Sequence, residues 1–228
     1  MCGIYGEYGL APDPNRIKEA MNNISFRNRG SKRYTLTLLE KRGNSTIEAT
    51  FPSFEEMVEF VDKDPLVKRP LLGFVFHVQS PTAMDAYNVD LFEQRQHPAE
   101  YQGLHVWHNG MMDEKALRGV TKDRGLDKAI WDTELLAEHL YDVVANGSLS
   151  GLDNFPGSFA LIGVTPDNHL WITRNKISPM FLGEDKEGTY RFCSVKLFPF
   201  MEPLPPGHVW NEGKIVYEHD NQYNPFGL

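Results

Sequence analysis

Residues 1–9 read Met-Cys-Gly-Ile-Tyr-Gly-Glu-Tyr-Gly, and this opening stretch guides the interpretation of the whole sequence. From Cys2 to Gly9, small or apolar residues alternate with others, and glycine is frequent. Such a pattern is typical of a buried strand that other backbone approaches closely. We therefore expect the chain to begin inside a sheet, with a cysteine at the start of its first strand.

Helices and further strands are expected in groups along the rest of the chain. Asp13-Pro14 predicts a helix start, and Ser53 with Glu56 predicts a capping box. Strand patterns joined by short turns dominate from Gly157 onward. The expected strands cover residues 34–38, 46–51, 71–78, 104–107, 158–164, 169–174, 180–183, 190–195, 209–211 and 215–217. This order favours antiparallel sheets with helices packed outside them, a layered α/β sandwich.

Length and composition are those of a globular domain. One hydrophobic core can organise 228 residues, so we expect residues 1–228 to form a single domain. Hydrophobic residues make up 41% of the chain, which separates it from disordered proteins. No apolar run approaches the roughly 20 residues of a membrane helix, and the start lacks a signal-peptide pattern. These features predict a cytoplasmic protein that does not bind membranes.

Charge and cysteine content exclude several other functions. A net charge of −8 argues against direct nucleic-acid binding, which requires clustered basic residues. Cys2 and Cys193 are the two cysteines, and neither shows a metal-ligand spacing with other cysteines or histidines. Cys193 lies in a strand pattern and is expected to be a buried, inert thiol. Without a metal motif or a glycine-rich phosphate loop, we predict no metal and no cofactor.

Cys2 combines two reactive groups once Met1 is removed, and its small side chain favours that removal. The freed α-amine has a reference pKa of about 7.7 to 8.0, and the thiol reference pKa is about 8.5. One residue can then provide both the nucleophile and the base in an attack on an amide carbonyl. The alternative interpretation of Cys2, when it is taken in isolation, is an early residue of a buried strand.

An ordered set of motifs along the chain resembles the glutaminase domain of class II glutamine amidotransferases. After the opening stretch, the motifs are FRNRGS at 26–31, HVQSPT at 77–82, HNG at 108–110, WDTE at 131–134 and GSFALIGV at 157–164. Later stretches continue the resemblance over nearly the whole chain. The resemblance implies an α+β fold, the four-layer αββα N-terminal nucleophile hydrolase sandwich with two mainly antiparallel sheets.

The same resemblance implies roles for individual residues. Cys2 matches the nucleophile, and Asn109 with Gly110 matches the oxyanion hole, whose N–H groups face the developing negative charge. Asp132 matches the carboxylate that binds the α-ammonium of glutamine, and Arg29 matches an arginine that orders the site. The simpler alternatives are an Asn-Gly turn, a helix N-cap at Asp132 and a solvated loop arginine.

Gln79 is the main departure from the family pattern. Many relatives have an arginine there that pairs with the α-carboxylate of glutamine, and a neutral amide lacks its charged, two-pronged donor. Three explanations are open at the sequence level. Another cation (Arg29, Arg33 or Arg95) takes over this role, the substrate is a different amide, or the site has lost its activity.

Taken together, the sequence predicts a glutaminase-type amidohydrolase that acts on a small-molecule amide. Because the glutaminase-like region fills the chain, we expect a free-standing subunit that releases ammonia for a separate partner enzyme. The alternatives are hydrolysis of a different γ-glutamyl or related amide, and a catalytically poor subunit with a regulatory or binding role.

Overall fold

The structure is a computed structural model that divides into two compact units. Contacts group Met1–Gln94 with Met180–Pro203, and Arg95–Pro179 with Leu204–Leu228. The structure describes residues 2–26, 33–41, 46–80, 96–113, 117–118, 131–145, 149–153 and 157–219. Each unit contains one antiparallel sheet, so the expected α+β class with two mainly antiparallel sheets is confirmed. Within these ranges, no helix is long and apolar enough to cross a membrane.

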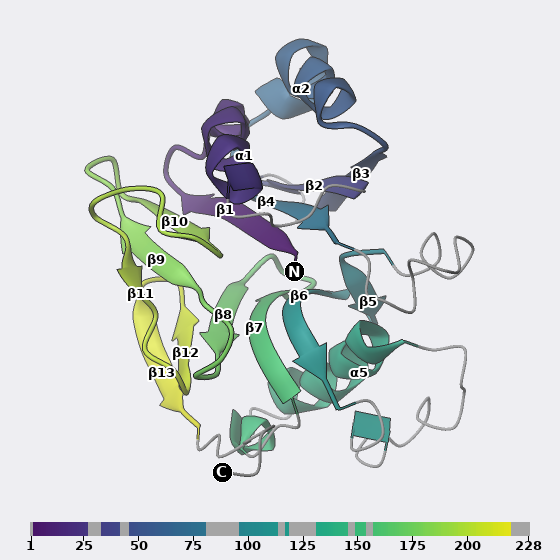
Figure 1. Ribbon diagram of the computed structural model, residues 1–228, viewed down its shortest axis with the longest axis vertical. Helices are drawn as coiled ribbons and strands as arrows, with labels where there is room; N and C mark the ends of the chain where they lie inside the picture. The colour runs from purple at the N-terminus through teal and green to yellow at the C-terminus, as the bar shows by residue number, and fades with distance from the viewer. Residues whose placement is uncertain are drawn as a thin grey trace. The chain divides into compact units, whose positions relative to one another are not determined.

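The first unit is built on a seven-stranded antiparallel sheet (Figure 1). Its strands are β1 (Gly3–Gly9), β2 (Arg33–Glu40), β3 (Thr46–Phe51), β4 (Leu71–Gln79), β9 (Phe181–Glu184), β10 (Thr189–Cys193) and β11 (Glu202–Pro203). Their order across the sheet is β11-β9-β10-β1-β4-β2-β3. Strand β1 pairs with β10 on one side and β4 on the other, which confirms that the chain begins inside a sheet.

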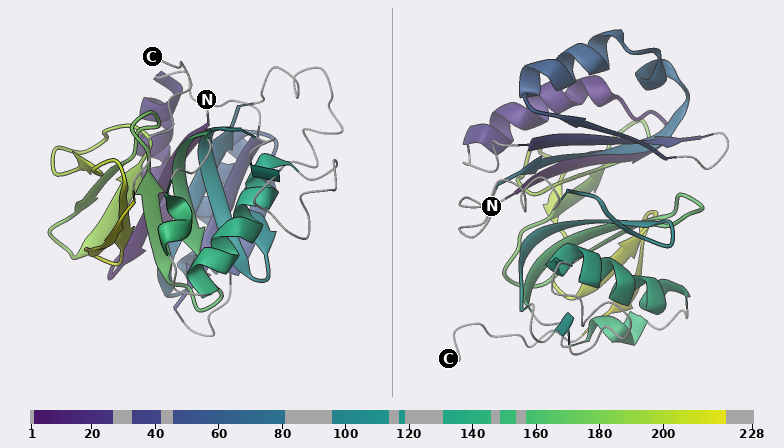
Figure 2. Two further views of the ribbon diagram at one scale, coloured as in Figure 1. Left: turned by 90° about the horizontal axis from the view of Figure 1, so that it is seen from below. Right: turned by 90° about the vertical axis from the view of Figure 1, so that its right-hand side faces the viewer.

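Two helices, α1 (Ile17–Phe26) and α2 (Phe54–Lys63), cover one face of this sheet (Figure 2). The chain reaches α1 through the 3-10 turn η1 (Pro14–Arg16), where the Asp13 side chain accepts a hydrogen bond from Asn15 N. Ser53 caps α2, because its Oγ accepts the backbone N–H of Glu56 at 3.2 Å and donates to the Glu56 carboxylate. Both predicted helix starts are therefore confirmed. A second 3-10 turn, η2 (Pro65–Lys68), leads from α2 to β4.

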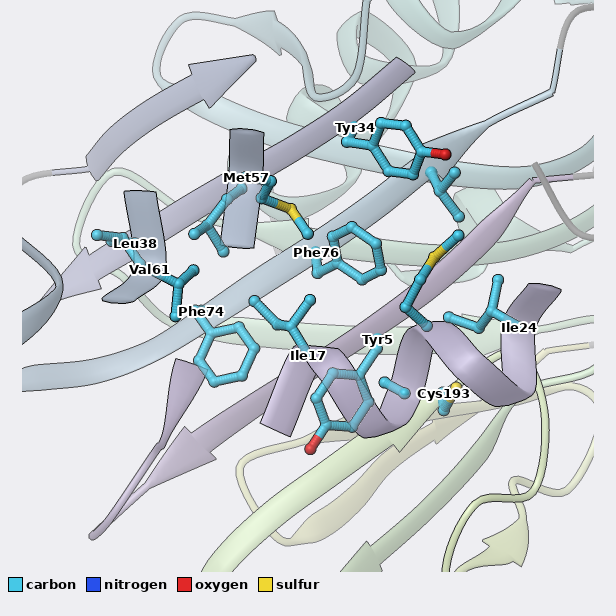
Figure 3. Close-up of a cluster of buried hydrophobic side chains, with 14 of the residues drawn as sticks. Tyr5, Ile17, Ile24, Tyr34, Leu38, Met57, Val61, Phe74, Phe76 and Cys193 are labelled. Carbon is cyan, nitrogen blue, oxygen red and sulfur yellow. The ribbon is translucent and has the colours of Figure 1, made fainter. Parts of the chain in front are cut away.

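The helix-covered face of the sheet carries the hydrophobic core of the first unit. Tyr5, Phe76 and Leu36 lie opposite one another on neighbouring strands, and each is almost fully buried. Figure 3 shows Tyr5 and Phe76 within this core. Ile17 and Ile24 of α1 pack onto this layer, as do Met57 and Val61 of α2. Cys193 also belongs to this core and is completely buried.

The second unit is built on a six-stranded antiparallel sheet. Its strands are β5 (Ala99–Tyr101), β6 (Leu104–Met112), β7 (Gly157–Val164), β8 (Leu170–Arg174), β12 (His208–Asn211) and β13 (Lys214–Glu218), in the order β13-β12-β8-β7-β6-β5. Helix α5 (Asp132–Ala145) contacts β5 and β6, and the 3-10 turn η4 (Leu149–Leu152) follows it. Leu135, Leu136 and Leu140 of the helix form a core with Leu104 and Val106 of the sheet.

Candidate functional site

Cys2 lies directly before β1, at the end of the sheet where β4 finishes. The antiparallel register pairs Gly3 with Val78, and one further step places Cys2 beside Gln79. The Cys2 Sγ atom is 3.9 Å from the carbonyl oxygen of Ser80, and the residue is half-buried. The predicted nucleophile thus sits at an accessible strand end, in contact with the loop that follows β4.

Gln79 is flanked on its other side by Arg33, the first residue of β2. The register pairs Arg33 directly with Gln79, and the next pair is Tyr34 with Val78. Tyr34 and Val78 belong to the helix-covered core, so Arg33 and Gln79 point to the opposite face. Both are buried, with 8% and 5% of their surfaces exposed. Cys2, Gln79 and Arg33 therefore form one row across three strands, which we call the Cys2 row.

The face that carries the Cys2 row is buried and holds several polar side chains, together with apolar ones such as Val75 and Ile4. His77 pairs with Thr35, and Val75 pairs with Thr37, in the two rows that follow on this face. His77, Thr35 and Thr37 are each at most 4% exposed. We call the face made by these rows the polar face of the sheet. Its existence was not predicted, because each of its members is an ordinary strand residue when taken alone.

A buried carboxylate anchors β1 close to the start of the chain. Glu7 is fully buried, accepts a hydrogen bond from the Tyr5 hydroxyl, and accepts the N–H of Asp13 at 2.8 Å. Arg16 Nη1 lies 2.9 Å from Glu7 Oε2, the same oxygen that accepts the Asp13 N–H. Burial raises the pKa of Glu7, and the hydrogen bonds from Tyr5 and Asp13 oppose that rise. These contacts fix β1 to the turn that follows it and so hold the strand that presents Cys2.

Asn109 and Gly110 lie inside strand β6, in the second unit. The sequence predicted that this strand ends at Trp107, but β6 continues to Met112. Asn109 pairs with Ala160 and Gly110 pairs with Phe159 on β7. The alternative interpretation of Asn109-Gly110 as a turn is therefore wrong. Local sequence misses this because Asn-Gly is a strong turn signal, whereas pairing with β7 keeps the segment extended.

The Asn109 side chain is a buried amide with an available donor. Only 1% of the residue is exposed, and Nδ2 has no hydrogen-bond acceptor among the described residues. Asn109 points to the face of β6 opposite α5, because Leu104 and Val106 occupy the helix side and successive residues alternate. A buried donor without a partner is costly, and it is a feature that functional sites retain.

Gly110 directs its backbone N–H away from β7. The N–H of Met111 bonds to Ser158 Oγ at 2.9 Å, and the N–H of Phe159 bonds to Asn175 Oδ1 at 3.2 Å. Gly110 and Phe159 are therefore a non-hydrogen-bonded pair, and the Gly110 N–H faces the other edge of β6. There, β5 pairs only with residues 104–106.

Glycine is also required at this position for steric reasons. A Cβ atom on Gly110 would lie 1.9 Å from the carbonyl oxygen of Ser158 and 2.8 Å from His108 Nε2. Real Cβ atoms do not approach other atoms so closely, and the first of these neighbours is backbone that cannot turn aside. The strand therefore offers two adjacent N–H donors, the Asn109 side chain and the Gly110 backbone.

Asp132 is the first residue of α5, near the same strand. Leu135 N donates to the carbonyl of Trp131, and Glu134 accepts the N–H of Trp131 at 3.3 Å. Trp131 thus occupies the N-cap position, so Asp132 does not itself cap the helix. Its Oδ2 lies 4.0 Å from His108 Nδ1, and its other oxygen accepts the Thr133 hydroxyl at 3.3 Å.

His108 joins the elements of the second unit. Its Nε2 is 3.2 Å from the carbonyl of Ser158, and a carbonyl can only accept, so Nε2 carries the proton. The opposite ring nitrogen faces Asp132. His108, which the sequence placed only within the HNG motif, thus contacts β7 and lies near the start of α5.

The other residues singled out from the sequence lie either outside the described ranges or in the core of the first unit. Arg29 and Arg95 lie outside the described residues. Cys193 is buried in the core of the first unit, as expected of an inert thiol. Within the described residues, no group of three or more His, Cys, Asp or Glu side chains is arranged to hold a metal ion. The candidate residues thus form two groups, the Cys2 row of the first unit and Asn109, Gly110 and Asp132 of the second.

No protein-family model matches the sequence, and the search of curated proteins gave no match. The fold is similar to that of solved structures. Glutamine phosphoribosylpyrophosphate amidotransferase from B. subtilis, complexed with ADP and GMP, aligns with a TM-score of 0.63 and 19% identity, covering 92% of this chain and 47% of its own. The allosteric regulatory enzyme of purine biosynthesis aligns with a TM-score of 0.64 and 18% identity, covering 92% and 46%.

A third structure is a glutamine aminotransferase class-II domain protein from Silicibacter pomeroyi. It aligns with a TM-score of 0.55 and 13% identity, covering 92% of this chain and 94% of its own. The chain spans about half the length of the first two structures. At these identities the similarity establishes the fold, and the expected N-terminal nucleophile hydrolase fold is confirmed.

Proposed function

We propose that this chain is an amidohydrolase of the class II glutamine amidotransferase type, with residues 1–228 working as a single domain. Its nucleophile is Cys2, exposed as the N-terminal residue after removal of Met1, and its substrate is glutamine. The observation that carries the proposal is the pair of donors on β6. Asn109 Nδ2 is buried without an acceptor among the described residues, and the adjacent Gly110 N–H faces away from β7.

Two such donors are suited to an oxyanion. When a nucleophile adds to an amide, the carbonyl oxygen becomes negatively charged, and preorganised N–H groups stabilise that charge most strongly where water is excluded. The buried position of Asn109 meets this condition. In the proposed function, Asn109 and Gly110 serve the tetrahedral intermediate that Cys2 generates.

The reaction begins with proton transfer from the Cys2 thiol to the α-amine, either directly or through a water molecule. The Sγ atom adds to the side-chain carbonyl of glutamine, and the developing oxyanion accepts hydrogen bonds from Asn109 and Gly110. The ammonium returns its proton to the leaving nitrogen, ammonia departs, and a γ-glutamyl thioester remains. Water then attacks the thioester, which releases glutamate and restores the thiol.

Substrate recognition is assigned to Asp132, Gln79 and Arg29. The Asp132 carboxylate would bind the α-ammonium of glutamine, because a cation requires an anionic partner. Its location at the start of α5 rather than at the N-cap supports this role, since both of its oxygens lie outside the capping interaction. Gln79 would contribute an amide donor near Cys2, and Arg29 would help to order the site.

The released ammonia would pass to a separate partner enzyme in the cytoplasm. The S. pomeroyi structure supports an independent subunit, because nearly all of that chain has this fold. We do not expect contact with nucleic acid or membranes. The partner would accept ammonia directly, since free ammonia is protonated and lost to solvent when it is not consumed.

Ammonia release from L-glutamine tests the proposed function. Wild-type protein should release ammonia, and Cys2→Ala should reduce turnover by at least about 10⁴-fold, because removal of a nucleophile abolishes the covalent path. Cys193→Ala is the matched control, since it removes the other thiol, which lies buried in the core. Turnover that survives Cys2→Ala, or that is lost equally in Cys193→Ala, would refute the role of Cys2.

A second candidate substrate class is favoured by Gln79, whose uncharged side chain lies beside Cys2. An amide that lacks a free α-carboxylate, such as a γ-glutamyl peptide or a modified small molecule, would suit a neutral donor. A panel of such amides, measured beside L-glutamine, separates the two classes by their kcat/KM values. A protein that turns over none of them, with or without a partner, would instead be a binding or regulatory subunit.

A further inference from the structure

Arg33 occupies a particular position relative to the thiol. Strands β2 and β4 are antiparallel, as are β4 and β1, so the start of β2, the end of β4 and the start of β1 meet at one edge of the sheet (Figure 1). Arg33 begins β2, Gln79 ends β4, and Cys2 precedes β1. Their side chains share the polar face, so the arginine and the thiol flank the same glutamine.

The spacing of the Cys2 row is compatible with a small amino-acid amide that bridges the Cys2 thiol and the Arg33 guanidinium. Two inter-strand steps separate the Cα atoms of Cys2 and Arg33 by about 10 Å. In glutamine, the amide carbon and the α-carboxylate carbon are four carbon–carbon bonds apart, which is about 5 Å. An arginine side chain extends about 6 Å. When the amide carbon of a glutamine molecule lies at Cys2 Sγ, the Arg33 guanidinium can therefore reach the α-carboxylate of that molecule.

Burial gives this arginine a preference for an anion. Only 8% of Arg33 is exposed, and a guanidinium taken out of water interacts more strongly with a carboxylate than one at the surface. Its planar donors match the two oxygens of a carboxylate, a geometry that lysine or glutamine cannot reproduce. Gln79 lies between the two residues and can add a neutral hydrogen bond to the same group.

We propose that Arg33 is the specificity-determining residue of the Cys2 row, and that it binds the α-carboxylate of the amide substrate. This inference rests on the proposed function and narrows its substrate class to amides with a carboxylate about four carbon–carbon bonds from the amide carbon. Arg33, which pairs with Gln79 from the neighbouring strand β2, thus provides the positive charge that position 79 lacks.

Binding rather than turnover is the decisive measurement, because it separates recognition from chemistry. In a Cys2→Ala background, calorimetry gives the Kd of L-glutamine and of L-glutaminamide, which has no α-carboxylate. Arg33→Gln should weaken L-glutamine binding by at least about 30-fold, the loss typical of an ion pair that loses one partner. Binding of L-glutaminamide should change by less than about 3-fold, since the group that Arg33 contacts is absent from it.

Two further variants test whether a loss of L-glutamine binding comes from the lost charge rather than from misfolding. The double variant Arg33→Gln with Gln79→Arg moves the cation one strand closer to Cys2, and it should recover at least about 10-fold of the lost L-glutamine affinity. Arg69→Gln removes another arginine of the first unit, which pairs with Glu40 at the surface and should leave both affinities unchanged. Circular dichroism spectra confirm that each variant is folded.

The outcomes distinguish this inference from the proposed function. Equal weakening of both ligands by Arg33→Gln, no weakening of either, or no measurable binding of L-glutamine to the Cys2→Ala protein would overturn the role of Arg33. Ammonia release from wild-type protein tests the function separately. Selective loss of L-glutamine binding without turnover would retain Arg33 as the carboxylate ligand and reject the hydrolase.

Discussion

The two faces of the seven-stranded sheet are both buried, but they differ in the number of polar side chains that they carry. On the helix-covered face, Leu36, Phe76 and Tyr5 lie in a row and belong to the same core as residues of α1 and α2. One residue further along β2 and β4, Thr35 and His77 form a row on the polar face, and both are at most 4% exposed. The same strands therefore present an apolar layer on one face and, on the other, a buried layer that includes polar side chains.

This contrast separates stability from function. Apolar side chains favour folding in proportion to the surface they bury, whereas buried polar groups contribute little net stability and are costly when they lack partners. Thr35, Thr37 and His77 are buried polar residues of that kind, and they lie among apolar neighbours such as Val75 and Ile4. Their location on the face that carries Cys2 is consistent with the proposed function.

The largest expected effect comes from breaking the apolar face. Phe76→Ala should lower the free energy of unfolding by about 3 to 5 kcal/mol, because it removes a fully buried ring and leaves a cavity. Chemical denaturation measures this directly. Under conditions where the variant is folded, its Kd for L-glutamine should be unchanged in the Cys2→Ala background. A large change in Kd at constant fold would show that the two faces are not independent.

The next effect tests the donors of the second unit. Asn109→Leu keeps the side-chain volume and removes Nδ2, so kcat for ammonia release should fall about 10²- to 10³-fold. The free energy of unfolding should change by less than about 1 kcal/mol, because Nδ2 has no acceptor among the described residues.

Asn175→Leu is the matched control for that substitution. Asn175 is equally buried, but its side chain donates to the carbonyl of Gly157 at 2.7 Å and accepts the N–H of Phe159 at 3.2 Å. The same substitution there should lower the free energy of unfolding by at least about 2 kcal/mol. A similar stability loss at both sites would contradict the assignment of Asn109 as an available donor.

A smaller change in the free energy of unfolding is expected at Thr37, on the polar face. Thr37 is fully buried, and its Oγ1 has no hydrogen-bond partner among the residues that the structure describes. Thr37→Val should therefore raise the free energy of unfolding by up to about 1 kcal/mol. Thr189→Val is the control, because the Thr189 hydroxyl accepts the N–H of Ala11 at 3.0 Å, and that variant should be destabilised by about 1 to 3 kcal/mol.

The smallest effect concerns exposed polar side chains, which water screens. His169 Nδ1 lies 2.6 Å from Glu212, and the hydrogen bond to this carboxylate raises the pKa of His169, with Asp167 acting in the same direction. A raised folded-state pKa gives stability that is present below the unfolded value of about 6.5 and is lost as pH rises through the folded value.

Glu212→Gln should therefore reduce the free energy of unfolding by about 0.2 to 1 kcal/mol at pH 6 and by a negligible amount near pH 9. Thermal denaturation across this pH range provides the measurement. A difference that grows with pH would have the wrong sign and would exclude the ion pair as its source.

Local signals in the sequence predicted the elements of the fold well. The opening strand, the helix start at Asp13-Pro14 and the N-cap at Ser53 depend on neighbouring residues, and the structure contains each of them. The end of β6 was misjudged because it is determined by pairing with β7, which lies about 50 residues away. Elements that depend on neighbouring residues can be predicted from the sequence, whereas strand ends that depend on pairing with a distant strand cannot.

The candidate site follows the same division. The sequence identified Asn109 and Gly110 by motif, and it offered Arg33 only as one of three possible cations. The position of Arg33 depends on two strand registers that join residues 2, 33 and 79. Register is a long-range property of the folded sheet, so no local pattern distinguishes Arg33 from other arginines.

Covalent labelling of Cys2 tests the central claim most directly. Wild-type protein is treated with 6-diazo-5-oxo-L-norleucine, and intact mass with peptide mapping locates the adduct. The account predicts a chain that lacks Met1 and carries a single adduct at Cys2, with no adduct in Cys2→Ala. A processed chain that remains unlabelled, or one modified at Cys193 instead, would contradict Cys2 as the nucleophile.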